Sequence, residues 1–190
     1  NVYVSTNVDI TEELTVTGNV YADKDLEVLG NVYADGNVVA YKDLLVTGNV
    51  YADGNVVAYK DLLVTGNVYV STNVDITEEL TVTGNVYADK DLEVLGNVYA
   101  DGNVVAYKDL LVSGNVYVST NVDITEELTV TGNVYADKDL EIMGNVYADG
   151  NVVAYKDLLV TGNTYVTGNV QVTKALVVSG NTHLEGNNVF

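Results

Sequence analysis

The carboxylates are the residues of this sequence that could perform acid–base or cation chemistry, and they recur in fixed patterns. Glutamates pair at Glu12-Glu13, Glu78-Glu79 and Glu126-Glu127, and aspartate follows lysine in repeated Lys-Asp steps. Paired carboxylates can act as acid and base or bind a cation. Asp-Gly-Asn, as at 35–37, shares its composition with calcium loops but lacks the EF-hand spacing. Solvated charged edges and turns account for both patterns, so we predict no metal site and no cofactor.

Other catalytic chemistry has few candidates. There is no cysteine, which excludes disulfides, zinc–thiolate sites, Fe–S clusters and cysteine nucleophiles. The one histidine, His183, has no serine nucleophile context and is interpreted as a surface residue. We therefore predict no catalytic residues and a protein that is not an enzyme.

Charge and composition exclude several kinds of partner. The chain carries 27 acidic against 8 basic residues, a net charge of -19, which opposes binding to nucleic acid or an anionic membrane. No apolar run approaches the roughly 18 residues of a membrane helix, so membrane insertion is not expected. Hydrophobic residues make up 47% of the chain, enough to bury a core.

A period of six residues positions every side chain. Glycine before Asn-Val or Asn-Thr recurs only at multiples of six, as at Gly18, Gly30, Gly36 and Gly48, without insertion or deletion. With that place as position one, positions three and five are almost always apolar, which predicts a short strand with two inward residues. Corners fall near positions six and one, where Gly tolerates positive φ and Asn or Asp bonds nearby backbone.

Stacking of like residues gives the number of sides per coil. At a lag of 18 residues each of eleven tyrosines at position four has a tyrosine partner, as Tyr3 has Tyr21, whereas a lag of 12 gives only three pairs. Lysines such as Lys24, Lys42 and Lys60 repeat the lag. The sequence predicts an all-β triangular β-solenoid, or β-helix, with three six-residue sides per 18-residue coil and about ten and a half coils.

The chain is predicted to be one continuous array over residues 1–190, ending in degenerate repeats at 162–190. Residues 66–113 and 114–161 are near-identical 48-residue copies, which differ only at Val94/Ile142, Leu95/Met143 and Ser113/Thr161. Because 48 residues are eight sides and a coil is three, each copy starts on a different face. No face keeps one chemistry along the shaft, and a threonine rank such as Thr47, Thr65 and Thr83 is too short for an ice-binding surface.

Two sets of outward residues are candidate surfaces for assembly. Stacked tyrosines bury area and stacked asparagines can hydrogen-bond along the axis. The tyrosine ladders contain Tyr33, Tyr51, Tyr69, Tyr87, Tyr99, Tyr117 and Tyr135. The outward apolar residues at position four are Val39, Leu45, Val57, Leu63, Val105, Leu111, Val153 and Leu159, near the position-six tyrosines Tyr41, Tyr59, Tyr107 and Tyr155. Contiguous exposed apolar residues imply contact with another molecule.

The stretches GNVYADKDLEVLGNV and GNVYADGNVVAY resemble polymer-forming β-solenoid proteins of the bactofilin type. That resemblance implies a right-handed β-helix that polymerises end to end into non-polar filaments without a nucleotide. The stretch VTGNTYVTGNVQVTKALVVSGNTHLEGNNVF is also similar to hexad repeats of bacteriophage fibre shafts, in which three chains can share the winding. Hexapeptide acyltransferases are a weaker likeness, because bulky residues follow position three here and no catalytic histidine setting is present.

The leading hypothesis is a structural protein, a segment of a self-assembling filament or fibre shaft, whose partners are other copies joined end to end or laterally. The alternative is a binding or adhesion module whose Tyr and Asn ladders contact a glycan, mineral or ice surface. We expect an extracellular, cell-surface or virion fibre in preference to a cytoplasmic filament.

Overall fold

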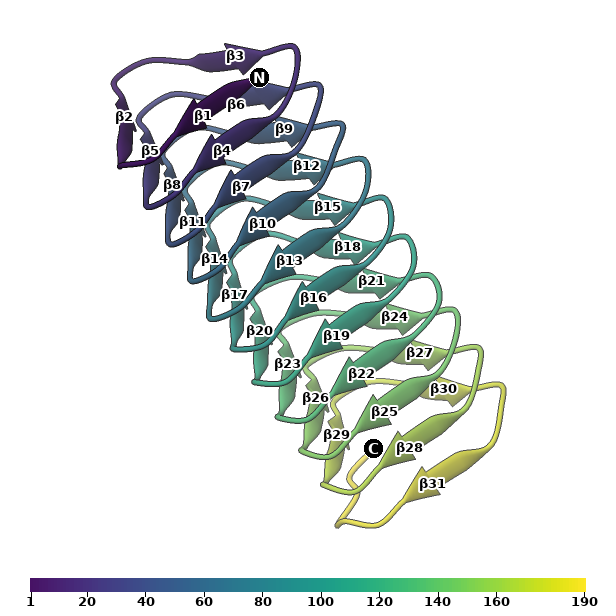
Figure 1. Ribbon diagram of the computed structural model, residues 1–190. Helices are drawn as coiled ribbons and strands as arrows, with labels where there is room; N and C mark the ends of the chain where they lie inside the picture. Colours follow the sequence, from purple (N-terminus) through teal and green to yellow (C-terminus); the bar gives the residue numbers. More distant parts are fainter.

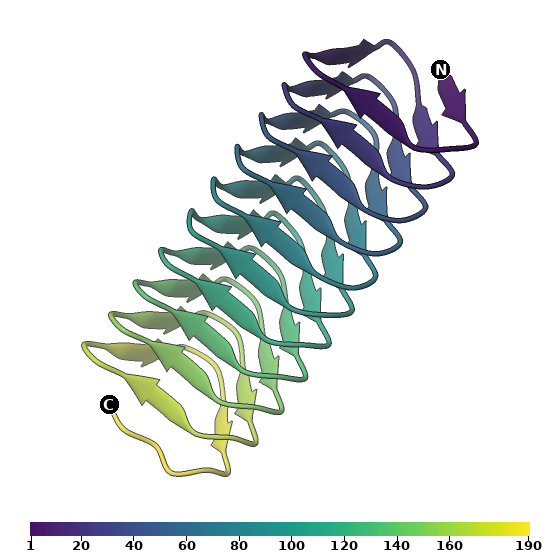
Figure 2. The same ribbon diagram turned by 90° about the vertical axis from the view of Figure 1, so that its left-hand side faces the viewer.

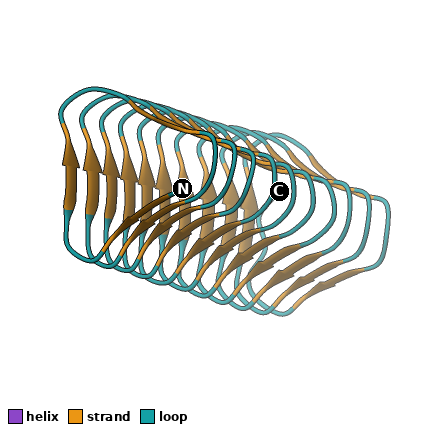
Figure 3. Ribbon diagram, turned by 45° about the horizontal axis from the view of Figure 1, so that its top comes forward, coloured by secondary structure: helices purple, strands orange, loops and turns teal.

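The computed structural model describes residues Asn1–Phe190, and the chain forms a rod of stacked triangular coils (Figure 1). It contains 31 strands of three residues and no helix. Figure 2 shows the coils stacked along one axis from the N-terminus to the C-terminus. Strands form the flat sides and loops form the corners (Figure 3). The predicted all-β solenoid is confirmed.

Each side of the triangle is one parallel sheet, built from every third strand. Sheet 1 contains β1 (Val2–Val4), β4 (Val20–Ala22), β7 (Val38–Ala40), β10 (Val56–Ala58), β13 (Val74–Ile76), β16 (Leu92–Val94), β19 (Leu110–Val112), β22 (Leu128–Val130), β25 (Val146–Ala148), β28 (Thr164–Val166) and β31 (Thr182–Leu184). Sheet 2 contains β2 (Val8–Ile10), β5 (Leu26–Val28), β8 (Leu44–Val46), β11 (Leu62–Val64), β14 (Leu80–Val82), β17 (Val98–Ala100), β20 (Val116–Val118), β23 (Val134–Ala136), β26 (Val152–Ala154) and β29 (Val170–Val172). Sheet 3 contains β3 (Leu14–Val16), β6 (Val32–Ala34), β9 (Val50–Ala52), β12 (Val68–Val70), β15 (Val86–Ala88), β18 (Val104–Ala106), β21 (Val122–Ile124), β24 (Leu140–Ile142), β27 (Leu158–Val160) and β30 (Leu176–Val178).

Strand pairing has the register that the tyrosine spacing predicts. Every strand pairs with the strand one coil on, so that residue i lies beside residue i+18, as Tyr69 beside Tyr87 and Val56 beside Val74. The pairing never slips along the shaft, and the 18-residue coil is confirmed.

The core runs along the axis of the rod. The first and third residues of the strands point inward, and 52 of them, from β3 to β29, form one cluster of buried hydrophobic residues. Leucines such as Leu44, Leu62 and Leu80 have no exposed surface. Because each fully buried aliphatic side chain contributes about 1.5–3 kcal/mol, this column is the main source of stability.

The glycines at the corners have a different role from the predicted one. No residue, glycine included, has positive φ, so the expectation that glycine supplies that conformation is wrong. Glycine is needed because successive coils approach closely: a Cβ on Gly66 would lie 2.6 Å from the carbonyl oxygen of Gly48. The N–H of Gly66 donates to that same oxygen at 3.1 Å.

The long repeat turns the surface pattern into a screw. A shift of 48 residues moves a side chain 2⅔ coils along the axis and onto another sheet, as it moves Val57 on β10 of sheet 1 to Val105 on β18 of sheet 3. Residues 1–47 also match 67–113 except for Thr47 and Ser113, and the added segment 48–65 is identical to 30–47. That added segment is one whole coil, so it leaves the order of the faces unchanged.

Candidate functional site

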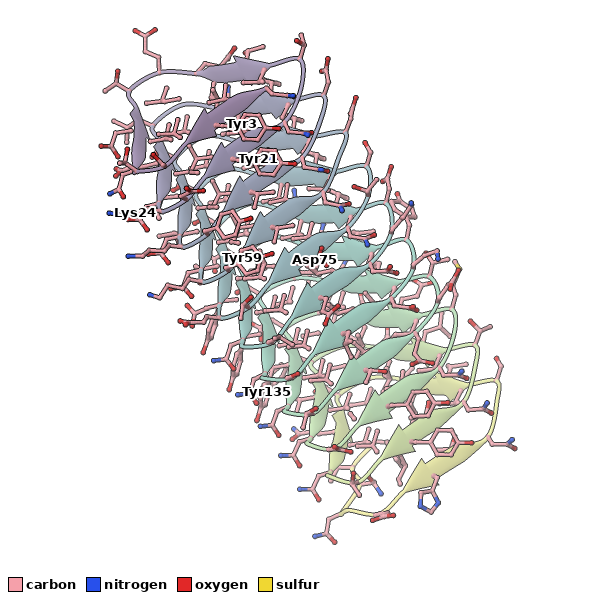
Figure 4. The ribbon with its side chains drawn as sticks, in the orientation of Figure 1. Tyr3, Tyr21, Lys24, Tyr59, Asp75 and Tyr135 are labelled. Atoms are coloured by element: carbon pink, nitrogen blue, oxygen red, sulfur yellow. The ribbon has the colours of Figure 1, made fainter.

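The tyrosine ladders form as the 18-residue lag predicts. Tyr3 and Tyr21 lie one above the other on sheet 1 (Figure 4), with ring centroids 4.8 Å apart and ring planes inclined by 6°. On sheet 3, Tyr51 and Tyr69 stack at 5.1 Å and 5°. All predicted ladder neighbours stack in this way, including Tyr33–Tyr51, Tyr69–Tyr87, Tyr99–Tyr117, Tyr117–Tyr135 and Tyr147–Tyr165.

Stacking decides which part of each tyrosine a ligand can reach. Inside a ladder both faces of a ring are covered by its neighbours, so the ring edge and the hydroxyl are what remain accessible. Burial raises the pKa of Tyr69, and the neighbouring Tyr87 and Tyr51 raise it further. Glycan binding by ring stacking requires an open aromatic face, and only the end rings of a ladder have one.

Asparagine ladders hold the corners together. The Oδ1 of Asn67 accepts the backbone N–H of Asn85 at 2.7 Å, and its backbone N–H donates to Oδ1 of Asn49, also at 2.7 Å. In the Asp-Gly-Asn corner at 35–37, the Oδ1 of Asn37 accepts the N–H of Asn55 at 2.8 Å. These side-chain oxygens are engaged by backbone, so corner stacking is their role.

The outward apolar residues gather at three corners of the rod. Val39, Val57, Leu45 and Leu63 surround the corner between sheets 1 and 2, together with the stacked pair Tyr41–Tyr59. Val105 and Leu111 flank Tyr107 between sheets 3 and 1. Val153 and Leu159 flank Tyr155 between sheets 2 and 3. We call these groups the apolar corners 39–63, 105–111 and 153–159; they face three different directions.

Exposure differs among the members of these corners. Leu63 is 46% exposed and Leu111 41%, so they project from the rod. Val39 and Val153 are only 8% exposed, although their side chains point outward. Their neighbours in the sheet cover them: Val39 lies between Tyr21 and Val57, and Val153 lies between Tyr135 and Gln171. The leucines and the corner tyrosines therefore supply most of the accessible apolar area.

The structure also brings together three acidic pairs that sequence reasoning missed. Asp9 on β2 lies directly beside Glu27 on β5, Asp75 on β13 beside Glu93 on β16, and Asp123 on β21 beside Glu141 on β24. Burial raises the pKa of Asp75, with further contributions from Glu93 and Asp91, and the pKa of Asp123 is raised in the same way by burial, Glu141 and Asp139. The 18-residue lag would have identified all three pairs, because it places like charges side by side.

The other residues that could take part in chemistry do not come together in one site. His183 lies near the C-terminal end, exposed, with its Nε2 3.2 Å from Oε1 of Glu185. Glu79 and Glu127 each accept a hydrogen bond from a nearby threonine hydroxyl, at 2.9 and 3.0 Å. No three His, Cys, Asp or Glu side chains converge as a metal site would require. No helix has the length and apolar character needed to cross a membrane.

Comparison with known proteins gives one match. A family model described as bactofilin, polymer-forming cytoskeletal, matches residues 8–105 and 74–189, which together span almost the whole chain. No curated protein and no solved structure matches.

Proposed function

This chain belongs to the bactofilin family of polymer-forming cytoskeletal proteins, and from that premise we propose how it assembles: copies join end to end through coil edges and side by side through the apolar corners. It is a structural, self-assembling filament protein. We also propose that the protein does not catalyse a reaction, bind nucleic acid or insert into a membrane. The chain's net charge of -19 repels the phosphate groups of nucleic acids.

The observation that carries end-to-end joining is the unbroken register. Each coil bonds to the next through the same backbone groups, as in Val68 N–H to Asn85 C=O and Val86 N–H to Asn103 C=O. One edge of any coil is therefore complementary to the opposite edge of any other coil. Joining through these edges runs head to tail and gives a polar filament, which differs from the non-polar filaments that the resemblance implies. Unpaired strand edges are templates for pairing with another chain, and stacked repeats propagate by contacts between neighbours.

A variant of the first coil tests this joint in the 190-residue chain. Val2 and Val4 direct backbone bonds to the second coil, through Asn19 C=O and Asp23 N–H. Neighbouring residues of a parallel strand direct their N–H and C=O groups to opposite sides, so the backbone groups of Tyr3 face away from the second coil. Tyr3→Pro therefore removes one N–H donor from the free edge and none from the contact between the first two coils. We expect long filaments for the unmodified chain in negative-stain micrographs and short particles for Tyr3→Pro. Filaments of equal length in both would contradict end-to-end joining at this edge.

Lateral contact is tested separately, because it affects width rather than length. The double variant Leu45→Glu/Leu63→Glu places charge in the apolar corner 39–63 and leaves the inward residues of β8 and β11 unchanged. We expect thinner bundles at unchanged filament length. Thr15→Glu is the control, since it adds charge at an exposed place on sheet 3, beside Tyr33 and away from the apolar corners. Unchanged bundle width in the double variant would remove this corner from the assembly.

A further inference from the structure

Two hollows of the same construction lie on the outside of the rod, 48 residues apart. The first, of about 290 Å³, is lined by Asp75, Glu93, Val57, Tyr59, Thr77 and Leu95. The second, of about 370 Å³, contains the corresponding residues Asp123, Glu141, Val105, Tyr107, Thr125 and Met143. We call them the first and the second acidic groove. They lie toward the two corners that flank sheet 1.

Short side chains open the first groove. Asp75 on β13 lies between Val57 on β10 and Glu93 on β16. Thr77 follows Asp75 at the corner, in the place that Tyr59 has one coil earlier and Leu95 one coil later. The two short residues are thus recessed between bulkier ones. Figure 4 shows Tyr59 and Asp75 near each other on this side of the rod, and both line the groove.

Negative charge in the groove has no cationic partner. Asp75 and Glu93 occupy directly opposed places in the sheet, where like charges destabilise a strand pair. Neither forms an ion pair: the structure has one lysine ion pair, Lys60 to Asp43 at 3.9 Å, and His183 beside Glu185. An external cation would relieve this repulsion.

The remaining walls fit a cation that is attached to an aliphatic chain. Tyr59 stacks on Tyr41 at 5.0 Å and 7°, and its other face is turned toward Thr77 and the groove. An open tyrosine face attracts an ammonium or guanidinium group. Val57 and Leu95 supply apolar surface, against which the methylene groups of lysine or arginine pack while the charged end reaches carboxylates.

We propose that each acidic groove binds a lysine or arginine side chain of a basic segment in a partner protein. A second copy of this chain can contact Val57 and Tyr59 through the apolar corner 39–63, but it fits the carboxylates poorly. It brings 27 acidic and only 8 basic residues, and its lysines mostly lie next to aspartates, as in Asp23-Lys24-Asp25. Charge complementarity therefore favours a basic partner. The second groove lies 2⅔ coils farther along the axis than the first, about 13 Å at ~4.8 Å per coil, and its carboxylates are on sheet 3 whereas those of the first are on sheet 1. Each groove therefore offers a separate site for a basic side chain.

The test measures binding of a fluorescent hexa-arginine peptide to the whole chain by anisotropy, with hexa-glutamate as the probe for non-specific binding. The groove variant is Asp75→Asn/Glu93→Gln/Asp123→Asn/Glu141→Gln, which removes four charges and keeps side-chain size. The charge-matched control is Asp35→Asn/Asp53→Asn/Asp101→Asn/Asp149→Asn, at exposed corners outside both grooves. We expect the groove variant to lose about tenfold in affinity, and the control about twofold through the general field.

An aromatic pair of variants separates the groove from the general field without changing charge. Tyr59→Ser removes the open ring, whereas Tyr41→Ser removes a ring of equal 50% exposure that lies outside the groove. Binding should weaken several-fold in Tyr59→Ser only. Equal losses in the groove variant and the charge-matched control, or in both tyrosine variants, would overturn the proposal. So would a groove variant that changes bundle width in micrographs but not peptide affinity, because a second copy would then be the occupant.

Discussion

The tyrosine ladder of sheet 3 and the acidic pair of sheet 1 have the same backbone geometry and opposite energetics. In both, residue i lies directly beside residue i+18, as Tyr69 beside Tyr87 and Asp75 beside Glu93. Parallel rings gain contact area in this arrangement, whereas parallel carboxylates repel. A solenoid in strict register stacks residue i on residue i+18 whatever the chemistry of the two side chains. Rings and amides stabilise the stack, and charges must find compensation elsewhere.

The comparison depends on the axial spacing between coils, and a substitution of a corner glycine should increase that spacing. Gly66→Ala places a Cβ 2.6 Å from Gly48 C=O, so the two coils must move apart and the neighbouring ladders must lengthen. We expect a loss of about 3 kcal/mol in the free energy of unfolding, from urea denaturation followed by circular dichroism. Lys60→Ala is the matched control, because Lys60 occupies the same position of its hexad and already has a Cβ. A similar loss in both variants would show that close approach is not what requires glycine.

Disruption of the asparagine ladder should have the second largest effect on the free energy of unfolding. Asn67→Ala leaves the part-buried N–H of Asn85 without its side-chain acceptor and removes the amide contact to Asn49. An unsatisfied donor costs about 1–3 kcal/mol, so we expect about 2 kcal/mol in the same assay. Asn1→Ala is the control, since Asn1 at the first coil bonds in one direction only, to the N–H of Asn19. Asn1→Ala should lower the free energy of unfolding by less than Asn67→Ala does.

The tyrosine ladder predicts a smaller effect that depends on place. Tyr69 has stacking neighbours on both sides, Tyr51 and Tyr87, whereas Tyr3 has only Tyr21. Each aromatic pair contributes about 0.5–1.5 kcal/mol, so Tyr69→Ser should cost about twice as much as Tyr3→Ser. Equal costs at the two places would mean that ring stacking contributes little beyond area burial.

Much of this architecture could be predicted because the pattern is strict. The lag of Tyr and Lys gave three sides per coil, and the stacked rings of Tyr33, Tyr51, Tyr69 and Tyr87 follow from it. The reason for the glycines could not be predicted, since it depends on the distance between coils rather than on local conformation. The burial of Val39 depends on neighbours one coil away on each side. The acidic pairs were missed because like-with-like stacking was considered only for residues that gain from it.

Stacking of the acidic side chains has the smallest expected effect on stability. It destabilises the folded state, whereas the tyrosine and asparagine ladders stabilise it. The folded-state pKa values of Asp75 and Asp123 are raised above the ordinary 3.8 by burial and by neighbouring carboxylates. The folded state therefore holds protons more tightly than the unfolded state does. The destabilisation of the folded state by these ionised carboxylates is complete above the folded-state pKa. It decreases as the pH falls through that pKa and is absent below 3.8.

The double variant Asp75→Asn/Asp123→Asn removes these two titrating groups. At pH 7 we expect it to exceed the unmodified chain in stability by about 0.5–1 kcal/mol, because solvent screens both half-exposed pairs. The difference should shrink as pH falls toward 4 and vanish below the unfolded pKa. Asp101→Asn/Asp149→Asn removes the same charge at exposed corners and accounts for general repulsion in the acidic chain. A gain that stays constant with pH, or that the control reproduces, would mean that stacked carboxylates do not oppose the register that stacked rings support.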